Sequence, residues 1–275
     1  MELTVVRIHK ASASGGQPWV QARPIIHPDK YLSQCPFILL NEESHPPLSQ
    51  FPIHSHRKVV TVTLVVDGSV EQTDGTGVHR SLGQGDAAFS IGSRGVMQGA
   101  TPSERGVKLL LLWINVPATL APSSEDHQIV RQADACRGTL GDAATLLYAG
   151  TLGATSGPHT SPWPITVADV SLQAGKRASL PLRSTERSFA YVLNGDIELG
   201  RNQVQLNRGN VAWIERTVDP GGVNSLSLRA TKESRILLFS SPMLDGADSA
   251  ANGNSADRCS EGPDDAATRT SPYAA

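Results

Sequence analysis

Aromatic residues are scarce in this chain, and neither sign of charge is in clear excess. Phe, Trp and Tyr make up 5% of the 275 residues, and 24 Lys plus Arg stand against 26 Asp plus Glu, for a formal net charge of −2. A protein that binds nucleic acid across a broad face needs a basic surface, and single-strand binders add aromatic rings on which bases stack. We therefore expect no direct nucleic-acid partner.

Cysteines and long apolar runs are rare as well. Cys35, Cys136 and Cys259 are odd in number and far apart, so they predict neither a CxxC site nor a disulfide framework. No stretch approaches the roughly 18 uninterrupted apolar residues of a membrane span, and the start of the chain lacks the apolar core of a signal peptide. We expect a soluble protein without membrane contact in a reducing compartment: the cytoplasm, or also the nucleus if the source is eukaryotic.

Short strand-like runs separated by Gly, Asp and Pro fill most of the chain. VVTVTLVV (59–66) and VKLLLLWINV (107–116) belong to a first series, and SFAYVLNGDIELG (188–200) and SRILLFSS (234–241) belong to a second. In both series an apolar strand reaches a Gly turn, and a Gly-Asp or Gly-Asn corner then opens the next strand. This rhythm predicts an all-β fold repeated about once per half-chain.

The boundaries follow from the change in composition along the chain. We predict an N-terminal barrel with its linker over residues 1–145 and a C-terminal barrel over residues 146–244. Residues 117–150 are mixed in pattern, and we expect them to bridge the two halves with some helix. Residues 245–275 are polar and rich in small side chains, so they bury too little apolar surface to offset their ordering entropy. We predict a disordered tail there.

One short segment, FPIHSHRKVV (51–60), carries the clearest chemical signal. His54 and His56 are one residue apart at the front of an apolar run. Alternate residues of a strand share a face, so the two imidazoles would be directed toward one ion or one bound molecule. A metal site needs three or four ligands, so the remaining ligands must come from elsewhere in the chain.

Taken together, these segments resemble the pirin family of bicupins. The resemblance spans about residues 20–243 and implies two cupin (jelly-roll-like) β-barrels in tandem. It is carried by CPFILLNE (35–42), FPIHSHRKVVTVTLVVDGSVEQTDGTG (51–77), GQGDAAFSIGSRGV (83–96), LLLLWINVPA (109–118) and SFAYVLNGDIELG (188–200).

The resemblance also implies where a metal would be held. In pirins the first barrel holds iron through four ligands, two from the HxH and two from a His and a Glu two residues apart. In the matching segment GSRGVMQGATP (92–102), Gln98 stands at the His position and Ala100 at the Glu position. A further glutamate that pirins often carry falls on Val60.

The metal set that the resemblance leaves is His54, His56 and Gln98. Two neutral imidazoles and a carboxamide oxygen bring no negative charge, whereas an Fe(II) site of the oxygenase type uses two His and a carboxylate. We therefore predict no bound cofactor, or Fe(II) at reduced affinity.

Several functions stay open, and with them the question whether the chain is an enzyme. The preferred hypothesis is that the N-terminal barrel binds a small organic molecule, contacted by Met97 and Gln98, and that His54 and His56 carry out metal-free isomerisation or cyclisation. The alternative for the two histidines is that they are remnants without a chemical role. The resemblance adds two further functions: iron-dependent quercetin 2,3-dioxygenase activity, and transcriptional co-regulation without catalysis through a protein partner.

Overall fold

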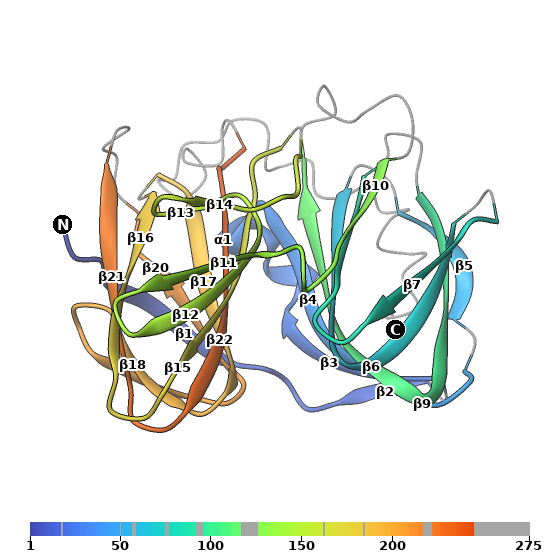
Figure 1. The fold of residues 1–275 in the computed structure, drawn as a ribbon, viewed down its shortest axis with the longest axis horizontal. Coiled ribbons are helices and arrows are strands. Elements are labelled where there is room, and N and C mark those ends of the chain that lie inside the picture. Colours follow the sequence, from blue (N-terminus) through green and yellow to red (C-terminus); the bar gives the residue numbers. More distant parts are fainter. Residues whose placement is uncertain are drawn as a thin grey trace. The chain divides into compact units, whose positions relative to one another are not determined.

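The structure, a computed structural model, consists almost entirely of β-strands arranged as two compact units (Figure 1). It describes residues 1–17, 19–49, 51–56, 59–74, 77–91, 96–116, 126–161, 163–183, 185–216 and 222–244; for Gln17, 51–56, 96–98 and Asp126 it describes the backbone alone. The all-β, two-barrel prediction is confirmed. The predicted tail at 245–275 lies outside the described residues.

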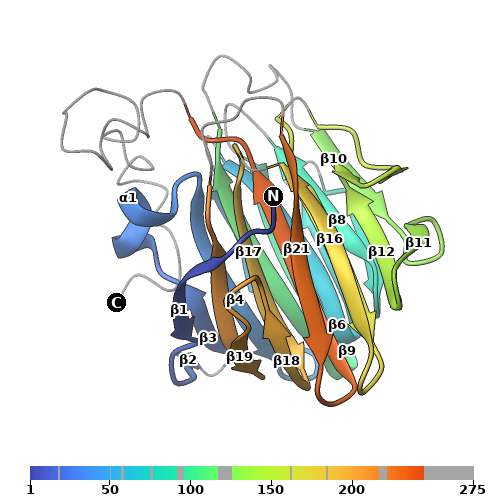
Figure 2. The same cartoon turned by 90° about the vertical axis from the view of Figure 1, so that its left-hand side faces the viewer.

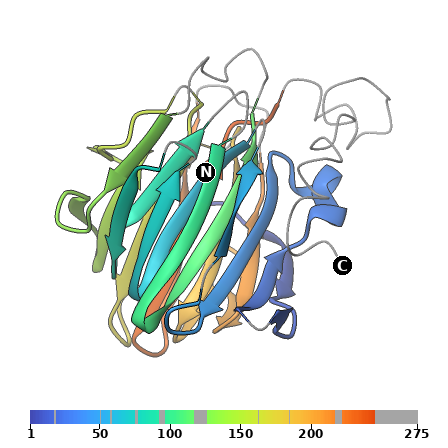
Figure 3. The same cartoon turned by 90° about the vertical axis from the view of Figure 1, so that its right-hand side faces the viewer.

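The N-terminal barrel is built from residues Ser12–Gln132. One sheet runs in the order β10-β8-β6-β9-β4-β3-β2, while β5 pairs with β9 and β7 pairs with β6 (Figure 3). The elements are β2 (Gly15–Gln17), β3 (Val20–Ile26), η1 (Pro28–Lys30), α1 (Tyr31–Gln34), β4 (Phe37–His45), β5 (Phe51–His56), β6 (Val59–Asp74), β7 (His79–Gly83), β8 (Ala87–Ile91), β9 (Val96–Asn115) and β10 (Asp126–Val130).

The two long strands, β6 and β9, each bend once and so contribute to both walls of this barrel. Their register breaks at the bend, with Gly68 paired to Val107 on one side and Val70 paired to Pro102 on the other. Gly68 and Gly106 have φ angles of +76° and +77°. A Cβ added at Gly68 would collide with the carbonyl oxygen of Gly106, so the bend requires glycine.

The C-terminal barrel combines residues Ala133–Met243 with Met1–Ala11. Its sheets run in the orders β1-β20-β17-β22-β15-β12-β11 and β16-β21-β18-β19 (Figure 2), and a small hairpin joins β13 to β14. The strands are β1 (Val5–Lys10), β11 (Cys136–Leu140), β12 (Ala143–Ala149), β13 (Thr151–Leu152), β14 (Thr155–Ser156), β15 (Thr166–Leu172), β16 (Arg177–Arg183), β17 (Arg187–Asn194), β18 (Asp196–Leu199), β19 (Val204–Asn207), β20 (Asn210–Ile214), β21 (Val223–Ala230) and β22 (Ser234–Ser241).

The domain boundaries differ from the predicted ones at two places. The first strand, β1, pairs with β20, and Leu3 and Val5 join the aliphatic core of the C-terminal barrel, so the first residues do not belong to the N-terminal one. The predicted division after residue 145 would cut β12, and the described part of the predicted linker forms strands without helix. Pairing between residues some two hundred positions apart leaves no local pattern, which is why the sequence did not indicate it.

Two further observations concern the surroundings of Cys35 and the helices of the chain. Cys35 is buried, and its Sγ atom lies 3.2 Å from the hydroxyl oxygen of Tyr31. Next to it, burial raises the pKa of Tyr31 to about 12, although a hydrogen bond from Asn115 acts in the opposite direction. Within the described ranges, no helix is long and apolar enough to cross a membrane.

The GQGD corner (83–86) is held together by the carboxylate of Asp86. It accepts hydrogen bonds from the backbone N–H of Gly83 (3.0 Å) and of Gln132 (3.0 Å) and from the guanidinium of Arg131 (2.7 Å). Burial opposes ionisation of Asp86, but these three donors outweigh it and lower its pKa.

Replacing Asp86 by Ala should therefore lower the free energy of unfolding by about 1–3 kcal/mol at pH 7, because three donors lose their acceptor. A group with a lowered folded pKa stabilises the fold above its unfolded pKa of about 3.9, and this contribution is lost as the pH falls through the folded value. The difference in free energy of unfolding between wild type and variant, measured by urea unfolding, should thus become smaller as the pH falls from 6 to 3. Asp134→Ala, at an exposed position, is the control and should change the free energy of unfolding little at either pH. A loss of stability in Asp86→Ala that does not depend on pH would contradict the account.

Candidate functional site

The backbone register places the HxH strand directly beside the strand that carries the other two family ligand positions. In the β5–β9 ladder His54 lies opposite Gln98, His56 opposite Val96, and Phe51 opposite Ala100. The sequence-predicted positions 54, 56 and 98 are therefore brought together, with Met97 opposite Ser55. Their side chains are not described, so this finding concerns positions along the strands.

On its other side the same stretch of β9 pairs with the second half of β6. Gln98 lies opposite Asp74 and Ala100 lies opposite Gln72. Gln72 and Asp74 lie at the C-terminal end of β6, away from the Gly68–Gly106 bend. The candidate site therefore lies at the end of the barrel opposite the bend.

The apolar side chains inside the N-terminal barrel are buried most completely near the bend. Near the bend, the apolar side chains are at most 5% exposed: Val65, Val70, Leu82, Ala88, Val107 and Leu109. Ala100, Leu111 and Ile129 pack against this cluster and yet keep part of their surface exposed. The described interior is therefore less tightly buried at these three residues than at the bend.

The carboxylates nearest to the candidate site in sequence are already engaged. Glu42 binds the ammonium of Lys108 (2.8 Å), and Glu43 binds the imidazole of His45 (2.9 Å). Glu71 contacts His79 (3.0 Å), and Asp74 binds Arg80 (2.6 Å) and accepts from the Val78 N–H. Across the part of the chain that the structure describes, His, Cys, Asp and Glu form no group of three or more that could hold a metal.

The sequence reasoning overlooked His127. It lies on β10 opposite Ser90, whose hydroxyl is 2.6 Å from the imidazole Nδ1. Two residues along β10, Ile129 packs against the interior cluster, so alternation places His127 on the inner face as well. Residues 127–130 (HQIV) do not alternate between polar and apolar side chains, so the local sequence did not indicate this strand.

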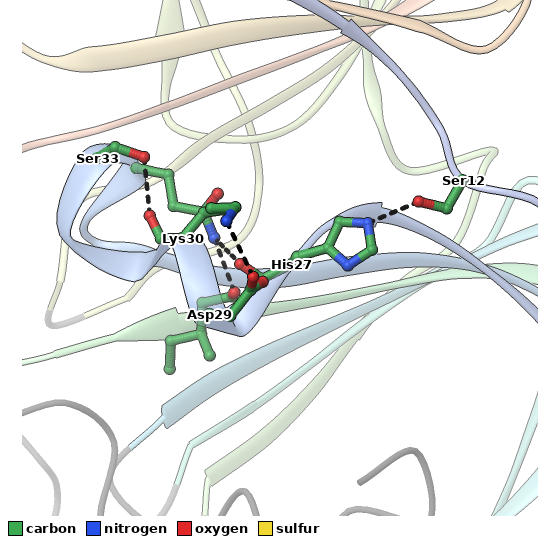
Figure 4. Close-up of polar contacts among 7 residues, drawn as sticks. Ser12, His27, Asp29, Lys30 and Ser33 are labelled. Atoms are coloured by element: carbon green, nitrogen blue, oxygen red, sulfur yellow. Dashed lines mark hydrogen bonds and ion pairs between the residues drawn. The ribbon is translucent and has the colours of Figure 1, made fainter. Parts of the chain in front are cut away.

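His27 is engaged in a different place, at the start of η1. Its Nε2 atom lies 2.8 Å from the hydroxyl of Ser12. The Asp29–Lys30 ion pair (3.2 Å) and the hydrogen bond from Ser33 to the Lys30 carbonyl (2.9 Å) lie in the same segment (Figure 4). These contacts are local to the segment around η1 and α1. We therefore do not count His27 among the functional residues.

The C-terminal barrel has a cavity of about 320 Å³, lined among others by Leu182, Glu186 and Ser240. The Ser240 hydroxyl donates to the Glu186 carboxylate (2.6 Å) and lies 2.9 Å from the Ser188 hydroxyl. Below these groups the barrel is filled by aliphatic side chains. The second barrel thus offers a small cavity with a few polar groups, and the described residues that line it include no histidine.

Comparison with known proteins agrees with this geometry. Residues 13–114 match the Pirin family and residues 167–245 match the Pirin C-terminal cupin domain. A Pseudomonas aeruginosa protein provisionally named as a quercetin 2,3-dioxygenase is 32% identical over 224 residues, which is 76% of each chain. The chain belongs to the pirin family.

Solved structures show the same fold at lower identity. The crystal structure of GK1651 from Geobacillus kaustophilus superimposes with a TM-score of 0.84 at 23% identity, covering 89% of this chain and 98% of the other. The Escherichia coli pirin YhhW, solved in complex with nickel(II), gives a TM-score of 0.69 at 15% identity, covering 86% of this chain and all of the other.

The pirin family implies a metal in the first barrel, and the residues of this chain do not fit one well. Ala100 has no donor atom at the position of the carboxylate, and the carboxamide at Gln98 carries no charge. The four carboxylates considered above each contact a Lys, Arg or His side chain. We therefore assign no chemical step in this barrel to a metal.

Proposed function

We propose that the N-terminal barrel of this pirin-family protein binds a small, largely apolar organic molecule, and that His54 and His56 exchange protons with it without a metal. The observation that carries the proposal is the β5–β9 register, in which His54 on β5 lies opposite Gln98 on β9. Ala100, two residues further along β9, has no atom that could bind a metal. Ala100, Leu111 and Ile129 are only partly buried, and they provide apolar side chains for the molecule to contact.

Two imidazoles on one strand suit a reaction in which a proton leaves one atom of the substrate and another is returned elsewhere. One neutral imidazole accepts the first proton, and the other, protonated, donates the second, so that charge and atoms balance over the cycle. Isomerisation and ring closure are reactions of this kind. Neither needs an oxidant or an external reductant.

The closure of 2′-hydroxychalcone to flavanone is a suitable probe, because the phenol loses a proton, its oxygen forms a bond to the β-carbon, and the α-carbon gains a proton. We expect this chain to accelerate the closure, and the double variant His54→Ala/His56→Ala to lose on the order of 100-fold or more of that acceleration. The reaction is followed by loss of chalcone absorbance. His79→Ala, at a histidine whose side chain is 60% exposed, is the matched control and should retain full activity. Turnover that is equal in the double alanine variant would refute the role of the two histidines.

The second candidate is an iron-dependent, quercetin 2,3-dioxygenase-like oxidoreductase. It is favoured by the name of the 32%-identical Pseudomonas relative, and nickel in the Escherichia coli pirin makes a metal consistent with the family. Oxygen uptake with quercetin that requires added Fe(II) would support this candidate. Co-regulation through a protein partner and a cytoplasmic location stay predictions.

A further inference from the structure

A buried carboxamide inside the N-terminal barrel has an acceptor with no partner. Gln72 is 4% exposed, and its Nε2 atom donates weakly, at 3.4 Å, to the hydroxyl of Thr63 on the first half of the same long strand. Its Oε1 atom is buried and has no hydrogen-bond partner. Leaving a buried polar atom unpaired costs free energy, so such an atom calls for an explanation.

Gln72 lies on the inner face of the barrel. Two residues before it, Val70 belongs to the interior apolar cluster, and the hydrogen bond to Thr63 joins the two halves of β6 across the inside. The carboxamide therefore stands just above the closed end of the barrel, at the level where Leu111, the partner of Thr63 on β9, keeps part of its surface exposed.

The neighbour of Gln72 on β9 is Ala100. The side chain of Ala100 is short and only partly buried, and it lies on the strand that also carries Gln98. The unpaired acceptor is thus buried next to a small apolar side chain that is itself partly exposed. A molecule that reaches Gln72 past Ala100 and offers a hydroxyl or N–H group would satisfy the Oε1 atom.

We propose that Gln72 is a ligand-binding residue of the N-terminal barrel, whose Oε1 atom accepts a hydrogen bond from a hydroxyl or N–H group of the bound molecule. This inference rests on the proposed function, since it needs a small molecule in the barrel. It adds the chemical class of that molecule: a neutral, largely apolar compound with one hydrogen-bond donor at the end that enters first. A neutral amide oxygen accepts a hydrogen bond from a hydroxyl or N–H group, whereas an ether of the same shape has no donor and cannot form this bond.

The test compares 2-naphthol with 2-methoxynaphthalene, which has the same ring system without the donor. Binding of each to the full chain is measured by fluorescence titration. We expect wild type to prefer the naphthol on the order of tenfold, and Gln72→Met, which keeps the volume but removes the acceptor, to lose that preference while binding of the ether stays unchanged.

Two further measurements make the result decisive. The unfolding midpoint of Gln72→Met without ligand should be equal to or above that of wild type, because the variant removes an unpaired buried oxygen. Thr63→Val, which removes the described partner of Gln72 and keeps its acceptor, should retain the preference for naphthol.

The outcomes separate this inference from the function on which it rests. If wild type binds neither probe, the small-molecule function of the barrel fails and the role of Gln72 fails with it. If both probes bind and Gln72→Met keeps the wild-type preference, the function stands and the inference is overturned, and water then satisfies the Oε1 atom.

Discussion

Replacing Gln98 by His and Ala100 by Glu in the same chain should give a barrel that holds about one Fe(II) per chain, where the parent holds little. The two substitutions complete a set of three imidazoles and one carboxylate with His54 and His56, and the carboxylate supplies the negative charge that the parent lacks. The register supports the choice of positions, since both lie on β9 beside the HxH strand. Ala100 is partly exposed inside the barrel, so a longer side chain has room there.

The measurement is elemental analysis of protein incubated anaerobically with Fe(II) and then passed through a desalting column. Gln98→His combined with Ala100→Gln is the matched control, because it adds the imidazole and the same side-chain length without the charge. We expect the control to retain much less iron than the variant with Glu. A parent protein that already retains near-stoichiometric iron would show that another ligand exists, and the dioxygenase candidate would then lead.

Replacing Arg235 by Met should destabilise the C-terminal barrel by about 3–5 kcal/mol, because it leaves the carboxylate of Asp169 buried without a counter-charge. Asp169 is 4% exposed, and the Arg235 guanidinium donates to both of its oxygens, at 2.9 Å and 3.0 Å from Nε and 2.6 Å from Nη2. The two residues lie on the neighbouring strands β15 and β22. The pair is therefore bidentate and largely shielded from water.

The matched control is the double variant Asp169→Leu/Arg235→Met, which removes both charges. We expect it to recover most of the lost stability, since replacing a buried ion pair by apolar side chains is often close to neutral. Urea unfolding at pH 7 gives the comparison, with the loss assigned to the transition of the C-terminal barrel because two units can unfold separately. A single variant that loses less than about 1 kcal/mol would mean that water reaches Asp169 once the arginine is gone.

Much of the fold and part of the site could be predicted because their causes are local. Runs of β-branched and apolar residues such as VVTVTLVV (59–66) favour strands wherever they stand, and the bend at Gly68 needs a backbone conformation that glycine alone adopts easily. The weakness of the metal site is also local. Ala100 has no donor atom in any fold, and the pairing of β5 with β9 puts that deficit beside His54 and His56.

Other features depend on groups that only the folded chain brings together. The pairing of β1 with β20, the donors to Asp86 from Arg131 and Gln132, and the Ser90–His127 contact join segments 37 to about 210 residues apart, and no periodicity records such distances. The sequence by itself therefore determined the long apolar strands, the repeated barrel and the lack of a donor atom at Ala100. Tertiary structure alone decided which carboxylates lie next to a cation, as Glu42 does next to Lys108. It also decided that the buried Oε1 atom of Gln72 has no hydrogen-bond partner, because burial and hydrogen bonding are properties of the packed barrel.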